Sequence, residues 1–331
     1  MAGMLPLPGL AQATSPSTMK AIAIHSYGGV DVLKHEDVPK PEPKEDEILV
    51  RVIAAGVNPV DAKIRQGAFG KSTLDKPLIP GFDISGVVEK TGAKITKFKV
   101  DDAIFAYLNL RRGGAYAEFA IATEEEATLK PKSLTHEQAA AVPLAALTAW
   151  QALIETAKLS EGQSVLIQGG SGGVGSFAIQ IAKARGAKVI ATASTANQEF
   201  LKQLGADQSI DYTSTKFEEV VNDVDVVLDA VGPATLARSY GVVKKGGIIV
   251  SILGPPDKAE LAKREIRGES ILVRPNASQL SDIAKLIEAK KIKSHVSQTF
   301  PLADAAKAHE QIESRHTRGK IVLSVAPEPK G

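Results

Sequence analysis

Residues 164–186 read SVLIQGGSGGVGSFAIQIAKARG, and this stretch decides the fold. Residues 164–168 form a short apolar run of the kind found in buried strands. Residues 174–185 predict a helix, because apolar side chains recur on one face at Val174, Phe177, Ala178, Ile181 and Ala182. A strand, a glycine-rich turn and a helix in immediate succession predict the first βαβ unit of a dinucleotide-binding domain.

The turn in this unit carries the spacing Gly170-x-Gly172-x-x-Gly175. We expect Gly170 to permit a tight turn, Gly172 to let the backbone approach a pyrophosphate, and Gly175 to allow close packing of helix and strand. Free N–H groups and the positive end of the helix dipole would then receive the diphosphate. The cofactor-binding residues expected here are Gly170, Ser171, Gly172, Gly173, Val174 and Gly175.

Strands and helices continue to alternate downstream of this unit. A strand is expected at residues 188–192, a helix at 198–204, and further buried strands at 224–229 and 248–253. Alternation of this kind is typical of a parallel sheet. We therefore place a dinucleotide-binding domain at residues 141–273.

The segment from Met19 to about residue 130 has a different texture. Short β-type runs at residues 20–24, 48–54 and 84–89 are separated by glycine and proline, which predicts an irregular antiparallel β-domain. The proline-rich residues 38–43 are expected to form a turn outside any sheet.

The chain is expected to return to this β-domain near its end, so the second domain comprises residues 19–140 and 274–331. Helices are expected at residues 135–146, 148–157, 279–289 and 304–314, and a last strand at 320–325. Residues 1–18 are uncharged and rich in Pro, Ser, Thr and Ala, which predicts a disordered leader rather than a targeting signal.

Composition excludes several classes of function. Lys plus Arg number 40 and Asp plus Glu number 38, so the net charge of +2 gives no reason to expect a nucleic-acid partner. The chain has no cysteine, which excludes disulfides, thiolate nucleophiles and cysteine-bound metals and suits a reducing compartment. It has no run of eighteen apolar residues, so no membrane span is expected. We expect a cytoplasmic protein.

The end of the second predicted strand favours NADP over NAD. NAD-binding domains place a carboxylate there to bond the ribose 2′-hydroxyl. Residues 191–197 read ATASTAN, with no carboxylate before Glu199. The hydroxyls of Ser194 and Thr195 could bond a 2′-phosphate; alternatively, they only cap the following helix.

Further motifs extend the pattern over the whole chain. They are residues 56–61 (GVNPVD), 81–88 (GFDISGVV), 113–118 (GGAYAE), 141–150 (AVPLAALTAW), 204–207 (LGAD), 210–212 (IDY), 229–232 (DAVG) and 318–323 (RGKIVL). With these motifs the chain resembles the zinc-independent quinone oxidoreductase branch of the medium-chain dehydrogenase/reductase superfamily over residues 19–325. Within that branch it is most similar to the enone, or alkenal, reductases.

The resemblance implies an α/β fold with a Rossmann dinucleotide-binding domain and an irregular antiparallel, GroES-like catalytic domain. Zinc-dependent relatives carry metal ligands at the positions of Asn58, Phe82 and Asp83. No zinc is therefore expected, and the six histidines show no metal-binding spacing. By the same resemblance the chain forms a homodimer through the edges of two dinucleotide-binding domains, with residues 246–253 near that edge.

The implied reaction is hydride transfer from NADPH to a quinone or to the conjugated C=C of an α,β-unsaturated carbonyl. Such acceptors delocalise the arriving charge onto oxygen, so positioning and a few hydrogen bonds can replace a metal. Two alternatives stay open, namely reduction of an enoyl thioester and a non-catalytic NADPH-binding protein.

The resemblance also implies the site residues. The catalytic candidates are Asn58, Lys63 and Tyr107, and the further cofactor-binding candidates are Ser194, Thr195, Tyr212, Val231, Gly232, Leu253, Gly254 and Lys320. Asn58 could instead be a turn residue before Pro59, and Lys63 a solvated charge. Many quinone reductases have a tyrosine where this chain has residues 68–70 (AFG), so the proton would come from Tyr107, Lys63 or water. A lysine common near the 2′-phosphate is replaced by Asn197 and Gln198, which puts strict NADP selectivity in question.

Overall fold

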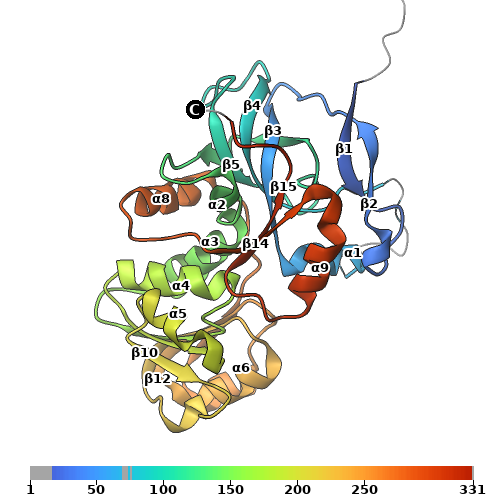
Figure 1. Ribbon diagram of the computed structural model, residues 1–331. Helices are drawn as coiled ribbons and strands as arrows, with labels where there is room; N and C mark the ends of the chain where they lie inside the picture. Colours follow the sequence, from blue (N-terminus) through green and yellow to red (C-terminus); the bar gives the residue numbers. More distant parts are fainter. Residues whose placement is uncertain (1–16, 69–73, 75–76, 330–331) are drawn as a thin grey trace, which may run out of the picture.

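The structure, a computed structural model, describes residues 17–68, 74 and 77–329. Figure 1 shows two parts, one built on a parallel sheet and the other on strands from both ends of the sequence. This arrangement confirms the predicted combination of a dinucleotide-binding fold and an irregular β-domain. Residues 1–16 of the expected leader lie outside the described residues, and Thr18 already begins the first strand. The domain bounds given above stay a prediction.

The first part holds a six-stranded sheet with the strand order β10-β9-β8-β11-β12-β13, in which every neighbouring pair is parallel. Its strands are β8 (Ser164–Gln168), β9 (Lys188–Ala193), β10 (Gln208–Asp211), β11 (Val224–Asp229), β12 (Val243–Ser251) and β13 (Arg267–Ser270). The order reverses between β8 and β11. In open parallel sheets, ligands bind at the carboxyl ends of the strands where the order reverses.

Helices connect these strands. They are α4 (Gly173–Ala184), α5 (Gln198–Gln203), α6 (Pro233–Ser239) and α7 (Lys258–Arg264), with 3-10 turns at Thr195–Asn197, Phe217–Glu219 and Tyr240–Val242. β8 and β11 have the predicted bounds, whereas β12 begins five residues earlier than expected and is covered at the sheet edge by β13. β12 is therefore not an edge strand; the edge on this side is β13, a strand that the sequence did not predict.

The second part holds a sheet with the order β14-β15-β3-β4-β5-β7, and β6 pairs with β3. Only β14 and β15 are parallel to each other; the other pairs are antiparallel. The strands are β3 (Glu47–Val57), β4 (Asp83–Thr91), β5 (Ala103–Tyr107), β6 (Phe119–Thr123), β7 (Ala127–Leu129), β14 (Val296–Pro301) and β15 (Lys320–Ser324). β15 thus returns from the end of the chain to pair with β3, as Figure 1 shows in red beside blue.

A small two-stranded sheet corrects one prediction. β1 (Thr18–Ala23) pairs antiparallel with β2 (Lys34–Pro39), so Val38 and Pro39 belong to a strand and not to a turn. Proline is tolerated here because β2 pairs on one side only, and a missing N–H on the outer edge costs no ladder bond.

The helices of this part include the segment that joins it to the parallel sheet. They are α1 (Pro59–Arg65), α2 (His136–Ala140), α3 (Pro143–Trp150), α8 (Ala277–Glu288) and α9 (Ala305–Glu313), with 3-10 turns at Val30–Val32 and Leu302–Asp304. The continuous helix predicted for residues 135–146 is wrong, because Pro143 cannot continue α2 and instead begins α3. The next predicted helix is the π-helical turn Gln151–Thr156 at the end of α3.

One apolar core joins the two parts. Phe82, Phe105 and Tyr107 of the β-domain belong to the same buried cluster as Val165 of β8 and Phe177 of α4. The two sheets are therefore packed against shared helices, which fixes the glycine-rich turn relative to the β-domain.

Candidate active site

The glycine-rich turn follows β8 at the point where the strand order reverses. Gly169 has φ +73°, which favours glycine, and its N–H donates to Thr192 Oγ1 at 3.2 Å. Gly170 donates to the Thr192 carbonyl at 2.8 Å, and a Cβ on it would lie 2.9 Å from Leu201 Cδ2. The turn residue is thus Gly169 rather than Gly170, which corrects the sequence-based prediction. The adjacent glycines Gly169 and Gly170 in the sequence could have indicated that the turn begins one residue earlier.

The N-terminus of α4 leaves room for an anion. A Cβ on Gly175 would lie 2.2 Å from the Gly169 carbonyl oxygen, so this glycine permits the close packing that was expected. A Cβ on Gly172 would meet only the Gly169 oxygen, at 3.5 Å. The first N–H groups of a helix have no partner within it, and Ser176 is the first whose N–H returns to the Gly172 carbonyl. This cradle suits a diphosphate.

Two loops at the carboxyl ends of β11 and β12 stand beside this cradle. Asp229 accepts hydrogen bonds from the N–H groups of Val231 and Gly232, at 3.2 and 3.1 Å, and from Ser251 Oγ at 2.8 Å. Buried Asp229 therefore holds both loops, a role that its place in the 229–232 motif did not predict. The exposed candidates Val231 and Leu253, with Gly232 and Gly254, lie on these loops.

The residues expected near a 2′-phosphate are already hydrogen-bonded to protein. Thr195 Oγ1 donates to Asp211 Oδ2 at 2.6 Å, and Ser194 Oγ accepts from Asn197 Nδ2 at 3.2 Å. Tyr212 is 58% exposed beside them. The pKa of Asp211 is lowered by hydrogen bonds, of which the one from Thr195 has the largest effect. A negative charge therefore lies among the residues expected to contact the 2′-phosphate. The sequence did not reveal this carboxylate because β10 brings it alongside β9.

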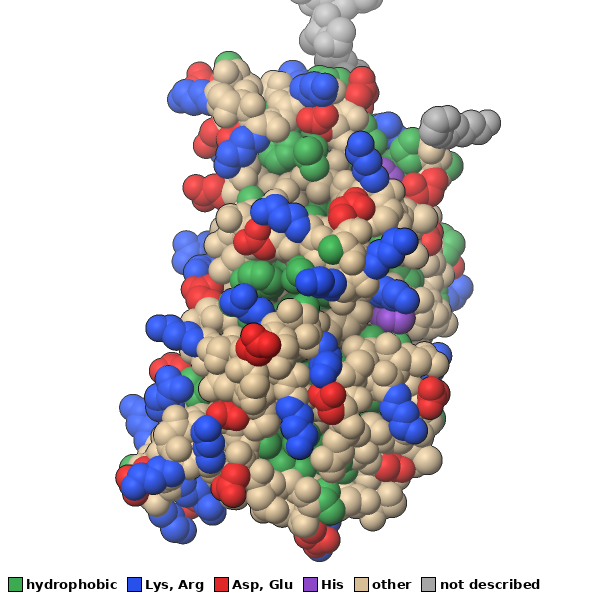
Figure 2. Space-filling view, turned by 90° about the vertical axis from the view of Figure 1, so that its left-hand side faces the viewer, with side chains coloured by type: hydrophobic (Ala, Val, Ile, Leu, Met, Phe, Trp, Pro, Cys, Tyr) green, Lys and Arg blue, Asp and Glu red, His purple; other side chains and the backbone are tan. Residues whose placement is uncertain are grey.

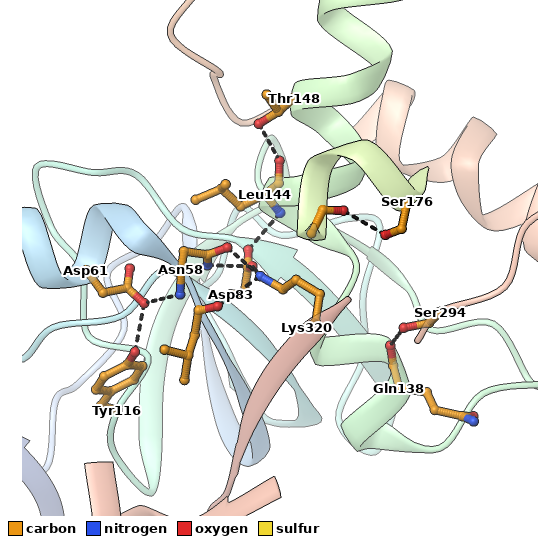
Figure 3. A network of polar contacts seen from close by, with 12 residues as sticks. Asn58, Asp61, Asp83, Tyr116, Gln138, Leu144, Thr148, Ser176, Ser294 and Lys320 are labelled. Atoms are coloured by element: carbon orange, nitrogen blue, oxygen red, sulfur yellow. Dashed lines mark hydrogen bonds and ion pairs between the residues drawn. The ribbon is translucent and has the colours of Figure 1, made fainter. Parts of the chain in front are cut away.

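A buried polar cluster lies on the other side of the cradle (Figure 3). Asn58 Nδ2 donates to Asp83 Oδ2 at 2.9 Å, and Lys320 Nζ donates to Asn58 Oδ1 and, at 3.1 Å, to the Val57 carbonyl. Lys320 Nζ also lies 3.6 Å from Asp83 Oδ2. Asn58 is 2% exposed and Lys320 is 3% exposed.

These three side chains come from distant parts of the sequence. Asn58 follows β3 and caps the N-terminus of α1, Asp83 begins β4, and Lys320 begins β15. Asp83 Oδ1 also accepts from the N–H of Leu144 at 2.8 Å, which ties the cluster to α3. Burial raises the pKa of Asp83 and lowers that of Lys320, while the opposite charge of each partner works against both shifts.

Asp61 supports the cluster from the side of α1. Its Oδ2 accepts from the Asn58 N–H at 2.8 Å and from Tyr116 Oη at 2.7 Å, and His309 Nε2 lies 3.3 Å from that phenol oxygen. Burial raises the pKa of Asp61 to about 7, against the lowering effect of its hydrogen bonds. The Asn58 backbone is therefore fixed separately from its side chain.

The other two catalytic candidates lie in different environments. Lys63 is exposed on α1. Tyr107 is fully buried beside Asp83 on the paired strand, with its Oη 3.5 Å from the Val273 carbonyl, and burial raises its pKa. The structure thus brings Asn58 and Lys320 together near the cradle and leaves Lys63 on the surface. Within the described residues, no three His, Cys, Asp or Glu side chains gather as a metal site would require.

Comparison with known proteins identifies the family. Residues 44–132 match the family described as alcohol dehydrogenase GroES-like domain, and residues 204–323 match the family described as zinc-binding dehydrogenase. The chain is 39% identical to the NADPH-dependent alkenal/one oxidoreductase, chloroplastic, of Arabidopsis thaliana, over 96% of this chain and 82% of that protein. The chain belongs to the medium-chain dehydrogenase/reductase superfamily.

Two further relatives place it within the superfamily. The 2-methylene-furan-3-one reductase of Solanum lycopersicum is 38% identical over 94% of this chain and 80% of its own length. The structure of the quinone oxidoreductase from Coxiella burnetii superposes with a TM-score of 0.86 at 35% identity, covering 93% of this chain and all of that one. The chain is therefore a member of the branch that holds quinone and alkenal oxidoreductases, as the sequence motifs predicted.

Proposed function

We propose that this protein transfers hydride from NADPH to a quinone or to the conjugated C=C of an α,β-unsaturated carbonyl. The observation that carries the proposal is the contact between the glycine-rich cradle and the buried cluster. Gly319 donates its N–H to the Ser171 carbonyl at 2.8 Å, and the stem of Lys320 packs beneath Gly173. A phosphate-binding loop and a shielded polar site thus adjoin each other, in a member of an oxidoreductase branch.

The residues present fit a dinucleotide. Gly172 leaves space for a diphosphate, the N-terminus of α4 supplies N–H donors, and the two loops held by Asp229 border the carboxyl edge of the sheet. NADPH, when bound, supplies the hydride. The chain's own contribution is to orient both reactants and exclude water, and Asn58 would donate a hydrogen bond to the acceptor oxygen as negative charge develops there.

The acceptor class follows from the chemistry of the cluster. Asp83 accepts two N–H hydrogen bonds and pairs with Lys320, so its carboxylate is occupied by protein partners and is not open as a metal ligand. An enone or quinone needs no metal ion, because its oxygen receives the charge by conjugation. The product enolate takes its proton from water or from Lys63, which is exposed on α1.

The test is initial-rate oxidation of NADPH, and separately of NADH, with a quinone, an α,β-unsaturated ketone, a 2-alkenal and an enoyl thioester. We expect turnover with the ketone, the alkenal or the quinone, and loss of the conjugated-carbonyl absorbance when the C=C bond is reduced. Turnover of the thioester alone would favour an enoyl-thioester reductase. Tight NADPH binding with every acceptor inert would favour a non-catalytic NADPH-binding protein.

The finer assignments belong to the same proposal. We propose a cytoplasmic homodimer that pairs through β13, one of the two edge strands of the parallel sheet and the one next to β12. Light scattering after gel filtration tests this, and a monomer would contradict it. Within the part of the chain that the structure describes, no helix has the length and apolar character needed to cross a bilayer. Figure 2 shows acidic and basic side chains interspersed over one face, which supports the absence of a nucleic-acid partner.

A further inference from the structure

The ammonium of Lys320 is engaged by protein atoms of the buried cluster. It donates hydrogen bonds to the Val57 carbonyl and to Asn58 Oδ1, and it forms an ion pair with Asp83 Oδ2 at 3.6 Å. The resemblance placed Lys320 among the cofactor ligands. Direct contact with a phosphate would require the ammonium to leave a buried carboxylate, which is costly.

The same contacts fix the orientation of the Asn58 carboxamide. Its oxygen faces the Lys320 ammonium and its nitrogen faces the Asp83 carboxylate. Rotating the amide by 180° would place an N–H against the ammonium and a carbonyl oxygen against the carboxylate. Both contacts would then be repulsive, so the ion pair permits one orientation only.

This orientation leaves one polar hydrogen of Asn58 available. Asn58 Nδ2 carries two hydrogens and donates one to Asp83; among the described residues the other has no partner. This second hydrogen is therefore the one that the amide has left to donate to a bound acceptor.

We propose that Lys320 and Asp83 act as a positioning pair that aims the Asn58 carboxamide at the acceptor oxygen. The pair also holds this carboxamide at a fixed position relative to the glycine-rich turn. The backbone fixes this relative position, because the N–H of Gly319, the residue before Lys320, donates to the Ser171 carbonyl of the turn. A Cβ on Gly173 would lie 3.0 Å from Lys320 Cδ, so the lysine stem packs directly against the turn. The inference rests on the proposed function, and it assigns Lys320 to Asn58 rather than to the cofactor.

The kinetic test measures hydride transfer in single turnovers at saturating NADPH and acceptor, together with the Kd of NADPH. We expect Asn58→Ala and Lys320→Met each to slow hydride transfer at least about tenfold, as loss of a positioned donor does. The double variant Asn58→Ala/Lys320→Met should be no more than about twofold slower than Asn58→Ala, because the lysine acts through the amide. The Kd of NADPH should stay within about threefold of the parent value, because Lys320 binds protein atoms.

Two controls separate positioning from folding. Lys320→Met leaves Asp83 buried and unpaired, so Lys320→Met/Asp83→Asn, which removes both charges, is measured beside it and should be equally slow with a higher Tm. Arg65→Met removes another buried cation, the one that pairs with Glu313 at 2.6 Å on the far end of α1. It should lower the Tm without slowing hydride transfer more than about twofold, since Arg65 does not contact the Asn58 amide.

A spectroscopic test does not depend on turnover. The chain has five asparagines, so selective ¹⁵N-asparagine labelling resolves the Asn58 side-chain NH₂ pair, assigned by its loss in Asn58→Ala. We expect one of these hydrogens to be protected from solvent exchange, and the protection to fall at least about tenfold in Lys320→Met/Asp83→Asn, because its acceptor charge is gone.

Three results would overturn the inference. One is an NADPH Kd that rises tenfold or more in Lys320→Met while hydride transfer at saturation is retained. Another is a double variant whose slowing is the product of the two single effects. The third is an unchanged protection of the Asn58 NH₂ hydrogens from solvent exchange in Lys320→Met/Asp83→Asn. Failure of the proposed function is a separate result, because it would leave the parent protein inactive toward every acceptor while the NMR comparison still decides the role of Lys320 and Asp83.

Discussion

The glycine-rich turn and the Asn58 cluster are neighbours built on opposite principles. The turn is a continuous stretch, Gly169–Gly175, whose function rests on backbone atoms and on the absence of side chains. The cluster consists of side chains from two strands and from the N-cap of α1, and 262 positions separate Asn58 from Lys320. The first is therefore a local property of the sequence, and the second exists only after the β-domain has closed.

The largest effect is expected from Gly175→Ala, which tests the local region. A Cβ here would lie 2.2 Å from the Gly169 oxygen and 2.7 Å from Gly170 Cα, both backbone atoms that cannot give way. Overpacking of this kind costs about 3 kcal/mol, which for a chain of 331 residues corresponds to a fall in Tm of roughly 4 °C. Calorimetry measures it. A Tm within 2 °C of the parent value would mean that α4 does not need this close approach.

Gly172→Ala sharpens the same contrast. The added methyl group would meet only the Gly169 oxygen, at 3.5 Å, and Gly172 has an ordinary φ of −76°. The Tm should therefore stay within about 2 °C, while the Kd of NADPH rises about tenfold because the methyl takes space that the diphosphate needs. Isothermal titration beside calorimetry separates the two effects. An unchanged Kd would place the diphosphate elsewhere.

A smaller effect is expected from Asp211→Asn. The Asp211 carboxylate holds the hydroxyl of Thr195, the residue expected to contact a 2′-phosphate. Removing the charge should raise the ratio of kcat/KM for NADPH over NADH about fivefold, since one exposed like-charge contact is lost. Asp282→Asn on α8, an exposed carboxylate paired with Lys285, should leave the ratio unchanged. If both variants behave alike, Asp211 does not face the phosphate.

The smallest effect concerns pH. Burial lowers the pKa of His136 to about 4, and the Ser85 hydroxyl, which donates to the Ile104 carbonyl, lies 2.8 Å from its Nδ1. Below about pH 6.5 the unfolded chain protonates this histidine and the native protein does not, so stability falls as pH drops toward 4. The slope per histidine is at most about 1.4 kcal/mol per pH unit.

His136→Asn keeps a donor to Ser85 and removes the titration. The Tm of this variant should fall less than that of the parent protein between pH 6.5 and 5, as measured by thermal unfolding. His309, whose pKa burial lowers to about 3, and Asp61, whose raised pKa of about 7 makes stability fall as pH rises from 4 to 7, are present in both proteins and cancel in the difference. Parallel curves would show that burial does not lower the pKa of His136 in the native state.

Elements with local signals were predictable from the sequence. The strands at Ser164–Gln168 and Val224–Asp229 were predicted with the correct bounds because their apolar runs and the adjoining turns are local signals. The predictions of a continuous helix through Pro143 and of a turn at Pro39 were wrong, because both outcomes depend on the surrounding tertiary structure. Pro143 starts a new helix within a stretch that is apolar throughout, and Pro39 is accepted because β2 has a free edge.

Pairings across the molecule were beyond local reasoning. Resemblance named Asn58 and Lys320 separately, with different roles, and named Asp83 only as a former metal-ligand position. Their contact depends on β15 pairing with β3 and β3 with β4, a register set by packing. Likewise Asp211 lies beside Thr195 only because β10 pairs with β9.

The position of β15 has a consequence for biosynthesis. Lys320 is translated long after Asn58 and Asp83, and β3 stays without one of its neighbouring strands until β15 has been made. The parallel sheet, which lies between them in the sequence, can form earlier from contacts of its own. A ribosome-bound chain is therefore expected to acquire its dinucleotide-binding surface first and its reactive site last, with Asp83 and the open edge of β3 exposed in the interval.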